Sequence, residues 1–356
     1  MTAYEKARNV AKAGHQARER AAAEIGIADL HHQQGRHEKA EKLYRAALTF
    51  FRNEAHRLGT PEARRDLSVS LNKTGDLAMN RGDHAGAEAA YQESLAIDRA
   101  LVAQVDTPQA RRDLSVSLNK IGDLARDRGD LAAALDAFQE SLAIDRALTA
   151  QLDTPQARRD LSLSLDRIGD LAQARGDHAG AEAAYQESLE LRRALAARLD
   201  TPQAQHDLSV SLNRIGDLAQ DRGDLAAALD AFQESLAIDR ALAAQLDTPE
   251  ARRDLSVSLD RIGDLARDRG DLAAATAALG ECLDIDRALA AQLNTPQAQC
   301  DLTISLYNMT RITLGTGDKD QARAFYDEGL ALIDRLHPDD HAEMRKAFAK
   351  LGGAFD

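Results

Sequence analysis

A Thr-Pro dipeptide recurs every 47 residues through most of the chain, and this constant period constrains the fold more than any other feature. Residues 107–153 and 201–247 differ at five positions, none of which carries a large apolar side chain. A repeat of constant length is typical of an array in which each copy packs only against its neighbours. The sequence therefore predicts one repetitive architecture. The six dipeptides begin at Thr60, Thr107, Thr154, Thr201, Thr248 and Thr295.

Each repeat carries start and stop signals for two helices. Thr107 is a favourable N-cap, and Pro108 suits the first helical position because its missing N–H is not needed there. Gly129 can adopt the left-handed conformation that ends a helix, and Asp130 can cap the next one. Leucine and alanine recur at helical spacing between these signals. We therefore expect each repeat to form a helical hairpin, with helices of about 21 residues and about 30 Å.

The composition agrees with an all-α fold. Apolar residues make up 44 % of the chain, aromatic residues only 4 %, and tryptophan is absent. The core must then consist mainly of leucine, isoleucine and alanine, which is a helical composition.

The repeat resembles the tetratricopeptide repeat in the spacing of its apolar, small and aromatic residues. The usual period of that family is 34 residues, so the 47-residue repeat is an extended form. The resemblance implies a right-handed α-solenoid of about seven helical hairpins followed by a C-terminal capping helix. Armadillo and HEAT arrays have similar periods, but the Gly-Asp turn and the small-residue positions favour tetratricopeptide packing. The matching positions are Leu118, Ile121, Gly122, Ala125, Gly129, Ala134, Phe138, Ser141 and Leu142.

The repeats divide the chain into three segments. Residues 1–59 are expected to form a divergent hairpin, and residues 60–294 form five near-identical repeats. Residues 295–356 contain an eroded last repeat and a final helix, which is expected around residues 339–350.

Charge and cysteine content exclude several classes of function. The 45 basic residues against 58 acidic ones give a net charge of −13, which argues against nucleic acid as a partner. No apolar run of membrane-spanning length and no signal peptide is present. Two cysteines cannot form a disulfide framework. We therefore expect a cytoplasmic protein without a membrane partner.

No pattern of residues predicts catalysis, so we expect a non-enzymatic protein without cofactor or metal. The sequence lacks a phosphate-binding loop. His31, His32 and His37 are interpreted as hairpin positions, and Pro338 interrupts the helix that would place His337 beside His341. Cys282 and Cys300 have no basic partner that recurs near them, and they are interpreted as structural thiols.

Residues of the first helices are the candidates for binding. By resemblance these helices line a concave groove, and the helical period places a set of residues opposite the apolar stripe. At successive repeats the set forms an arginine row, an apolar row, a mixed Asn/Asp row and an aspartate row. The candidate binding residues are Arg112, Val116, Asn119, Asp123, Arg159, Leu163, Asp166, Asp170, Val210, Asn213, Asp217, Arg253, Val257 and Asp264.

Two interpretations stay open for these rows. The apolar row either contacts a partner or packs against neighbouring first helices. The aspartate row either attracts a basic segment or forms a solvated, ion-paired surface. The leading hypothesis is a scaffold or adaptor that binds a protein or peptide, such as a basic or amphipathic segment. The alternatives are a peptide-responsive regulatory sensor and an accessory subunit of a bacterial signalling or defence effector. The sequence does not specify an oligomeric state.

Overall fold

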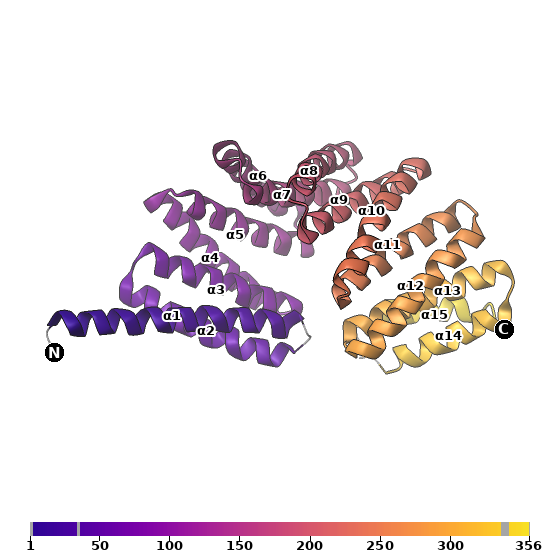
Figure 1. Ribbon diagram of the computed structural model, residues 1–356, viewed down its shortest axis with the longest axis horizontal. Helices are drawn as coiled ribbons and strands as arrows, with labels where there is room; N and C mark the ends of the chain where they lie inside the picture. Colours follow the sequence, from indigo (N-terminus) through magenta and orange to yellow (C-terminus); the bar gives the residue numbers. More distant parts are fainter. Residues whose placement is uncertain (1–2, 34–35, 336–341, 356) are drawn as a thin grey trace. The chain divides into compact units, whose positions relative to one another are not determined.

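The computed structural model describes residues 3–33, 36–335 and 342–355, and over these ranges it consists of fifteen α-helices without a β-strand (Figure 1). Fourteen of the helices form seven consecutive pairs, and α15 (Ala342–Gly352) follows them. The first helices of the pairs are α1 (Ala3–Gln33), α3 (Pro61–Asn80), α5 (Pro108–Asp127), α7 (Pro155–Ala174), α9 (Pro202–Asp221), α11 (Pro249–Asp268) and α13 (Pro296–Thr316). The second helices are α2 (His37–Leu58), α4 (His84–Val105), α6 (Leu131–Leu152), α8 (His178–Leu199), α10 (Leu225–Leu246), α12 (Leu272–Leu293) and α14 (Lys319–Ile333).

The chain divides into two compact units, residues 1–184 and residues 185–356, with the division inside α8. Unit 1 contains α1 to α7 and the start of α8, and unit 2 contains the rest of α8 and α9 to α15. Each unit is a stack of helical hairpins in which consecutive helices pack against each other (Figure 1).

The capping residues act as the sequence predicts. The Thr107 hydroxyl accepts a hydrogen bond from the Ala110 backbone N–H at 3.2 Å, and Asp130 accepts one from the Ala133 backbone N–H at 3.0 Å. Gly129 has φ +79°, in the left-handed region that favours glycine. The all-α fold, the seven hairpins and the final helix are confirmed. The final helix begins at Ala342, and its predicted start at residues 339–341 lies outside the described residues.

Second helices also end in the left-handed conformation, which the sequence analysis missed. Asp106, Asp153 and Asp247 have φ between 39° and 49° at the helix ends. Aspartate tolerates this conformation better than most residues because its short polar side chain can hydrogen-bond locally. The residue that precedes each Thr-Pro therefore reverses the chain between repeats; it is Asp in four cases, Gly59 in the first and Asn294 in the last.

A leucine near the end of the first helix joins a repeat to the one before it in α3, α5, α7 and α11. Leu124 of α5 packs against Ala87 and Tyr91 of α4, and Leu171 of α7 packs against Ala134 and Phe138 of α6. The equivalent leucines at positions 77, 124, 171 and 265 are only 0–4 % exposed. This leucine, covered by an alanine and an aromatic ring of the preceding second helix, is called the stacking leucine below.

The C-terminal end of unit 2 is closed by α15. Phe348 is fully buried, and its ring lies 5.5 Å from the Tyr307 ring and 5.8 Å from the Tyr326 ring. A Cβ atom on Gly329 would approach the Phe348 ring to 2.4 Å, so the two helices meet closely there. The final helix therefore covers the apolar face that α13 and α14 would otherwise expose.

Glycine in the first helices lets the two helices of a hairpin approach closely. A Cβ atom on Gly122 would lie 2.3 Å from the Phe138 ring of α6, which leaves no room for a methyl group. Gly280, inside α12, has nothing within 4 Å of its Cβ position. The two glycines thus differ in packing although both lie within helices.

We expect Gly122→Ala to lower the free energy of unfolding by roughly 1–3 kcal/mol, because the methyl group must displace the Phe138 ring. Gly280→Ala is the matched control, and it should be neutral or stabilising by up to about 1 kcal/mol because alanine favours the helix. Urea unfolding followed by circular dichroism measures both. Equal effects of the two substitutions would contradict this account of the hairpin.

Candidate functional site

The predicted apolar row is exposed at three positions of the first helices, whereas Val69, Val210 and Ile304 are half-buried. Val116 of α5 and Leu163 of α7 are 38 % and 37 % exposed, and Val257 of α11 is similarly exposed. The neighbours of Val116 on both sides, Ser115 and Ser117, are buried. Neighbouring helices therefore do not cover the row at its exposed positions. The apolar strip, as it is called below, comprises Val69, Val116 and Leu163 of unit 1. The corresponding residues of unit 2 are Val210, Val257 and Ile304.

The arginine row forms ion pairs between successive first helices. Arg112 Nε lies 2.5 Å from a carboxylate oxygen of Asp160, and Arg253 Nε lies 2.7 Å from one of Asp301. His206 takes the place of the arginine once, with its Nδ1 3.0 Å from Asp254, and this hydrogen bond raises the pKa of His206. Arg159 also takes part in an interaction within the chain. These side chains hold adjacent repeats together on one flank of the apolar strip.

The aspartate row on the other flank is also paired within the chain. Lys120 Nζ lies 2.7 Å from Asp76, one repeat earlier, and Arg167 Nε lies 3.2 Å from Asp123. In unit 2, Arg261 donates to Asp217 at 3.0 Å. Each of these basic residues comes from the first helix of the following repeat. The carboxylates are consequently partly neutralised before any partner approaches.

Two further aspartates of this row have basic neighbours. Asp170 lies 3.9 Å from Arg126 of α5, and Asp264 accepts a hydrogen bond from Arg267 on its own helix. Two interpretations of the aspartate row were open, a site for a basic segment and an ion-paired surface. At the described positions these contacts favour the ion-paired surface.

The mixed Asn/Asp row needs correction, because part of it is not on the surface. Asn119 and Asp166 are buried, and Asn119 donates to Ser164 at 3.4 Å. Asn213 is half-buried. The error arises because a helical projection assumes one buried side, whereas each first helix is covered by its own second helix and by its neighbours. Asn119 and Asp166 are therefore part of the packing between helices and not of an exposed surface.

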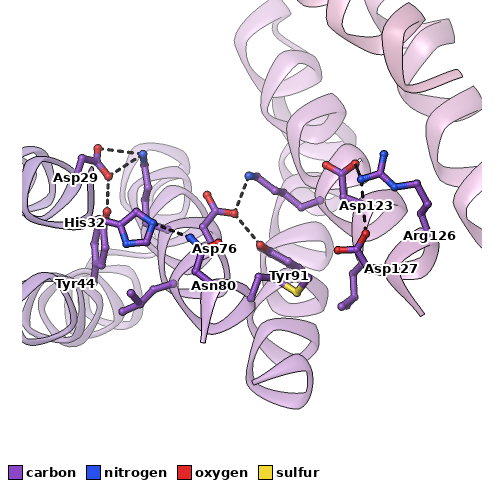
Figure 2. A pocket seen from close by; sticks show the side chains of 14 residues that line it. Asp29, His32, Tyr44, Asp76, Asn80, Tyr91, Asp123, Arg126 and Asp127 are labelled. Carbon is purple, nitrogen blue, oxygen red and sulfur yellow. Dashed lines mark hydrogen bonds and ion pairs between the residues drawn. The ribbon is translucent and has the colours of Figure 1, made fainter. Parts of the chain in front are cut away.

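A cavity of about 470 Å³ lies beside the strip in unit 1, among α1, α3 and α5 (Figure 2). Asp29, Asp76 and Asp123 contribute carboxylates to it at 47-residue intervals. The hydroxyls of Tyr44 and Tyr91 donate to Asp29 and Asp76 at 2.5 and 2.7 Å. Burial and the neighbouring carboxylates raise the pKa of both tyrosines, so the hydroxyls stay protonated donors. The pairing was not predicted from the sequence. The signal for it is the constant spacing, because each tyrosine follows its aspartate by fifteen residues.

The next repeat lacks such a hydroxyl because residue 138 is phenylalanine. Asp123 is instead close to Arg126, at 3.5 Å, and Arg126 also approaches Asp127 at 3.6 Å. Figure 2 shows these three side chains at one end of the cavity. The lining thus combines carboxylates, ammonium and guanidinium groups and phenols. Such a surface suits a segment with several hydrogen-bonding groups better than one isolated ion.

A buried aspartate recurs behind the strip in the second helices. Ser117 donates to Asp98 at 2.6 Å, and Ser164 donates to Asp145 at 2.6 Å. Desolvation raises the pKa of Asp98 to about 6, and it raises the pKa of Asp145, Asp239 and Asp286. The repeated serines and aspartate were a visible signal in the sequence, but their burial was not.

One repeat reverses the charge at this position. Arg192 of α8 stands where the other near-identical repeats have aspartate, and it is buried as they are. Its guanidinium donates to the Ser211 hydroxyl at 2.8 Å and to the Asp207 carbonyl at 3.1 Å. The serine accepts here, whereas its counterparts donate to the buried aspartates.

The described residues contain no group of three or more His, Cys, Asp or Glu side chains that could hold a metal ion. His337 and His341 lie outside the described residues. Cys282 is buried, and burial beside Asp286 raises the pKa of its thiol to about 12. Its thiol therefore stays protonated, which agrees with a structural role. None of the helices in the described ranges combines the length and apolar character needed to span a bilayer.

Comparison with known proteins finds two segments of this repeat type. Models described as tetratricopeptide repeat match residues 25–53 and 162–197. No curated protein matches the chain by sequence.

Several solved structures share the fold. The apo form of RapI is 12 % identical with a TM-score of 0.62, and the match covers 94 % of this chain and 86 % of RapI. BtubC from P. vanneervenii is 20 % identical with a TM-score of 0.57, covering 71 % and 92 %. A signal transduction ATPase with a tetratricopeptide repeat sensor from Pyrococcus horikoshii is 16 % identical with a TM-score of 0.56, covering 92 % and 44 %. At these identities the likeness shows the fold alone.

The buried aspartates predict that the protein becomes more stable as the pH falls from about 8 to about 5. Their pKa is higher in the folded chain than in the unfolded one, so the folded state binds the extra protons in this range. For Asp98, the full rise of the pKa from 3.8 to about 6 corresponds to on the order of 3 kcal/mol, of which roughly half is gained between pH 8 and pH 5. Thermal unfolding across this pH range measures the slope, and Asp98→Asn should reduce it. A slope that the substitution leaves unchanged would refute this assignment.

Proposed function

The chain is a protein of tetratricopeptide-type repeats, and we propose that it is a non-enzymatic scaffold that binds a segment of another protein along the apolar strip. The single observation that carries the proposal is the exposure of Val116 and Leu163 between buried neighbours. An apolar surface with a polar rim is typical of an interaction site. A second row of exposed apolar residues recurs at the ends of the second helices, with Leu152 among them.

The flanks of the strip support this use. Arg112–Asp160 lies on one side and Lys120–Asp76 on the other, so an apolar centre has a charged rim. Protein interfaces have the same organisation, with a desolvated centre and a polar edge. The ion pairs also connect successive first helices, which limits the ordering that binding requires.

The internal ion pairs narrow the chemistry of the partner. A strongly basic segment would have to compete with Lys120 and Arg167 for the carboxylates of Asp76 and Asp123. An apolar side chain meets no such competition at Val116 or Leu163. The proposed partner is therefore an amphipathic segment whose apolar face covers the strip and whose polar face remains in water.

We expect Val116→Asp combined with Leu163→Asp to weaken binding of strip ligands at least about tenfold, because two contacts at the centre are replaced by charges. Ligands would be selected from a displayed library of amphipathic peptides on the full wild-type chain. Their affinities would then be measured by fluorescence anisotropy for both proteins.

Leu152→Asp is the comparison, because Leu152 is equally exposed, at 42 %, but belongs to the row at the ends of the second helices. The two variants therefore decide which of the two rows binds. Leu152→Asp should leave the affinity unchanged. Thermal melts of all three proteins establish that the fold is retained. Ligands that bind the double variant as tightly as the wild type would exclude the strip as the binding surface.

A further inference from the structure

Helix α1 lies at the N-terminal end of the stack in unit 1 (Figure 1), and one of its faces carries exposed apolar residues. Ala23, Gly26, Ile27 and Leu30 lie on one side of the helix, because their spacing of three, one and three residues follows the helical period. All four are exposed, with Ile27 at 48 % and Leu30 at 57 %. These four residues are called the α1 stripe below.

The α1 stripe continues the interface that stacks the repeats. Leu30 precedes the stacking leucine Leu77 by 47 residues, and it therefore occupies the same position in the first hairpin. Leu77 is covered by Ala40 and Tyr44 of α2. Leu30 is the member of this series that the described residues leave exposed. The end of the stack thus presents a stacking surface in the register that later repeats bury.

Substitutions at this end favour close contact with another helix. Gly26 stands where Lys73 and Lys120 reach back to the preceding aspartate, so no long charged side chain crosses the α1 stripe. A Cβ atom on Gly26 would meet nothing within 4 Å. Glycine here is therefore not required by packing inside the chain. It leaves a shallow place on the helix surface where a side chain of another helix can fit.

The α1 stripe is complementary to itself. Its two small residues, Ala23 and Gly26, precede its two large ones, Ile27 and Leu30. If two copies of α1 cross antiparallel about a two-fold axis beside Gly26, each Leu30 meets Ala23 of the second copy. Each Ile27 then meets Gly26 of the second copy. Large residues face small ones, which is the condition for close helix packing.

We propose that a second copy of this chain covers the α1 stripe, so that the protein forms a two-fold dimer through α1. A two-fold contact uses the same patch on both copies, which agrees with the self-complementarity of the stripe. Four side chains cover less area than the roughly 800 Å² per partner of a standard interface. We therefore expect a weak and reversible dimer.

Sedimentation velocity on the full chain tests the proposal over about 1–200 µM. The mass of the wild type should rise from one chain to two across this range. Leu30→Glu should keep the protein monomeric, because it would bury two carboxylates at the contact. Leu152→Glu, the same change at an exposed leucine of α6, should dimerise like the wild type, and circular dichroism melts verify that all three fold.

Cysteine cross-linking identifies the face independently. Gly26→Cys places a thiol beside the proposed axis and should yield a disulfide-linked dimer under mild oxidation. Arg20→Cys is the comparison, because the Arg20 side chain is 82 % exposed and the antiparallel arrangement places the two copies of residue 20 about 20 Å apart along the helices. Cys282 and Cys300 are present in both proteins, so their contribution is the same.

Three results would overturn the proposal. The first is a wild type that stays monomeric over the whole range. The second is a dimer that persists unchanged in Leu30→Glu or is lost equally in Leu152→Glu. The third is a dimer that cross-links through Arg20→Cys but not through Gly26→Cys, which would place the two-fold axis at another position along α1.

Discussion

The contact between a stacking leucine and the preceding second helix is the interaction on which the other features depend. Leu124 reaches its buried position only because Ala87 is small and Tyr91 is a flat ring beside it. Each contact joins two repeats, and every further repeat buries its stacking leucine in the same way. The last hairpin of unit 2 is covered differently, by Phe348 of α15. At α1 the equivalent residue, Leu30, is exposed.

Charges in this protein serve mainly to connect repeats. Arg112 reaches Asp160 and Lys120 reaches Asp76, each across one repeat boundary, on opposite flanks of the apolar strip. Exposed ion pairs of this kind contribute little individually to stability. Their regular spacing instead keeps the first helices in register and gives the strip its charged rim. The buried aspartates do the opposite, because Asp98 is destabilising when ionised and is retained with only serine donors around it.

Much of the fold was predictable from the sequence, whereas the site was predictable only in part. Thr107, Pro108 and Gly129 mark helix boundaries through local geometry, which needs no knowledge of distant contacts. The helical period placed Val116 opposite the apolar stripe, but it left open whether neighbouring first helices cover it. The burial of Asn119 was not predictable either, because it depends on how closely the next first helix approaches. The pairing of Tyr91 with Asp76 likewise requires two helices of one hairpin to be placed in space.

The sequence by itself determined the repeat, the two helices of each hairpin and the residues that cap them, because these depend on contacts a few residues apart. Only the tertiary structure decided which charges are already neutralised and which apolar residues stay uncovered. Asp123 and Arg167 pair although they are 44 residues apart in the sequence. Leu30 and Leu77 occupy the same position of the repeat pattern. They differ in burial because, in the described part of the chain, only Leu77 has a preceding second helix against it, and that contact forms only in the assembled array.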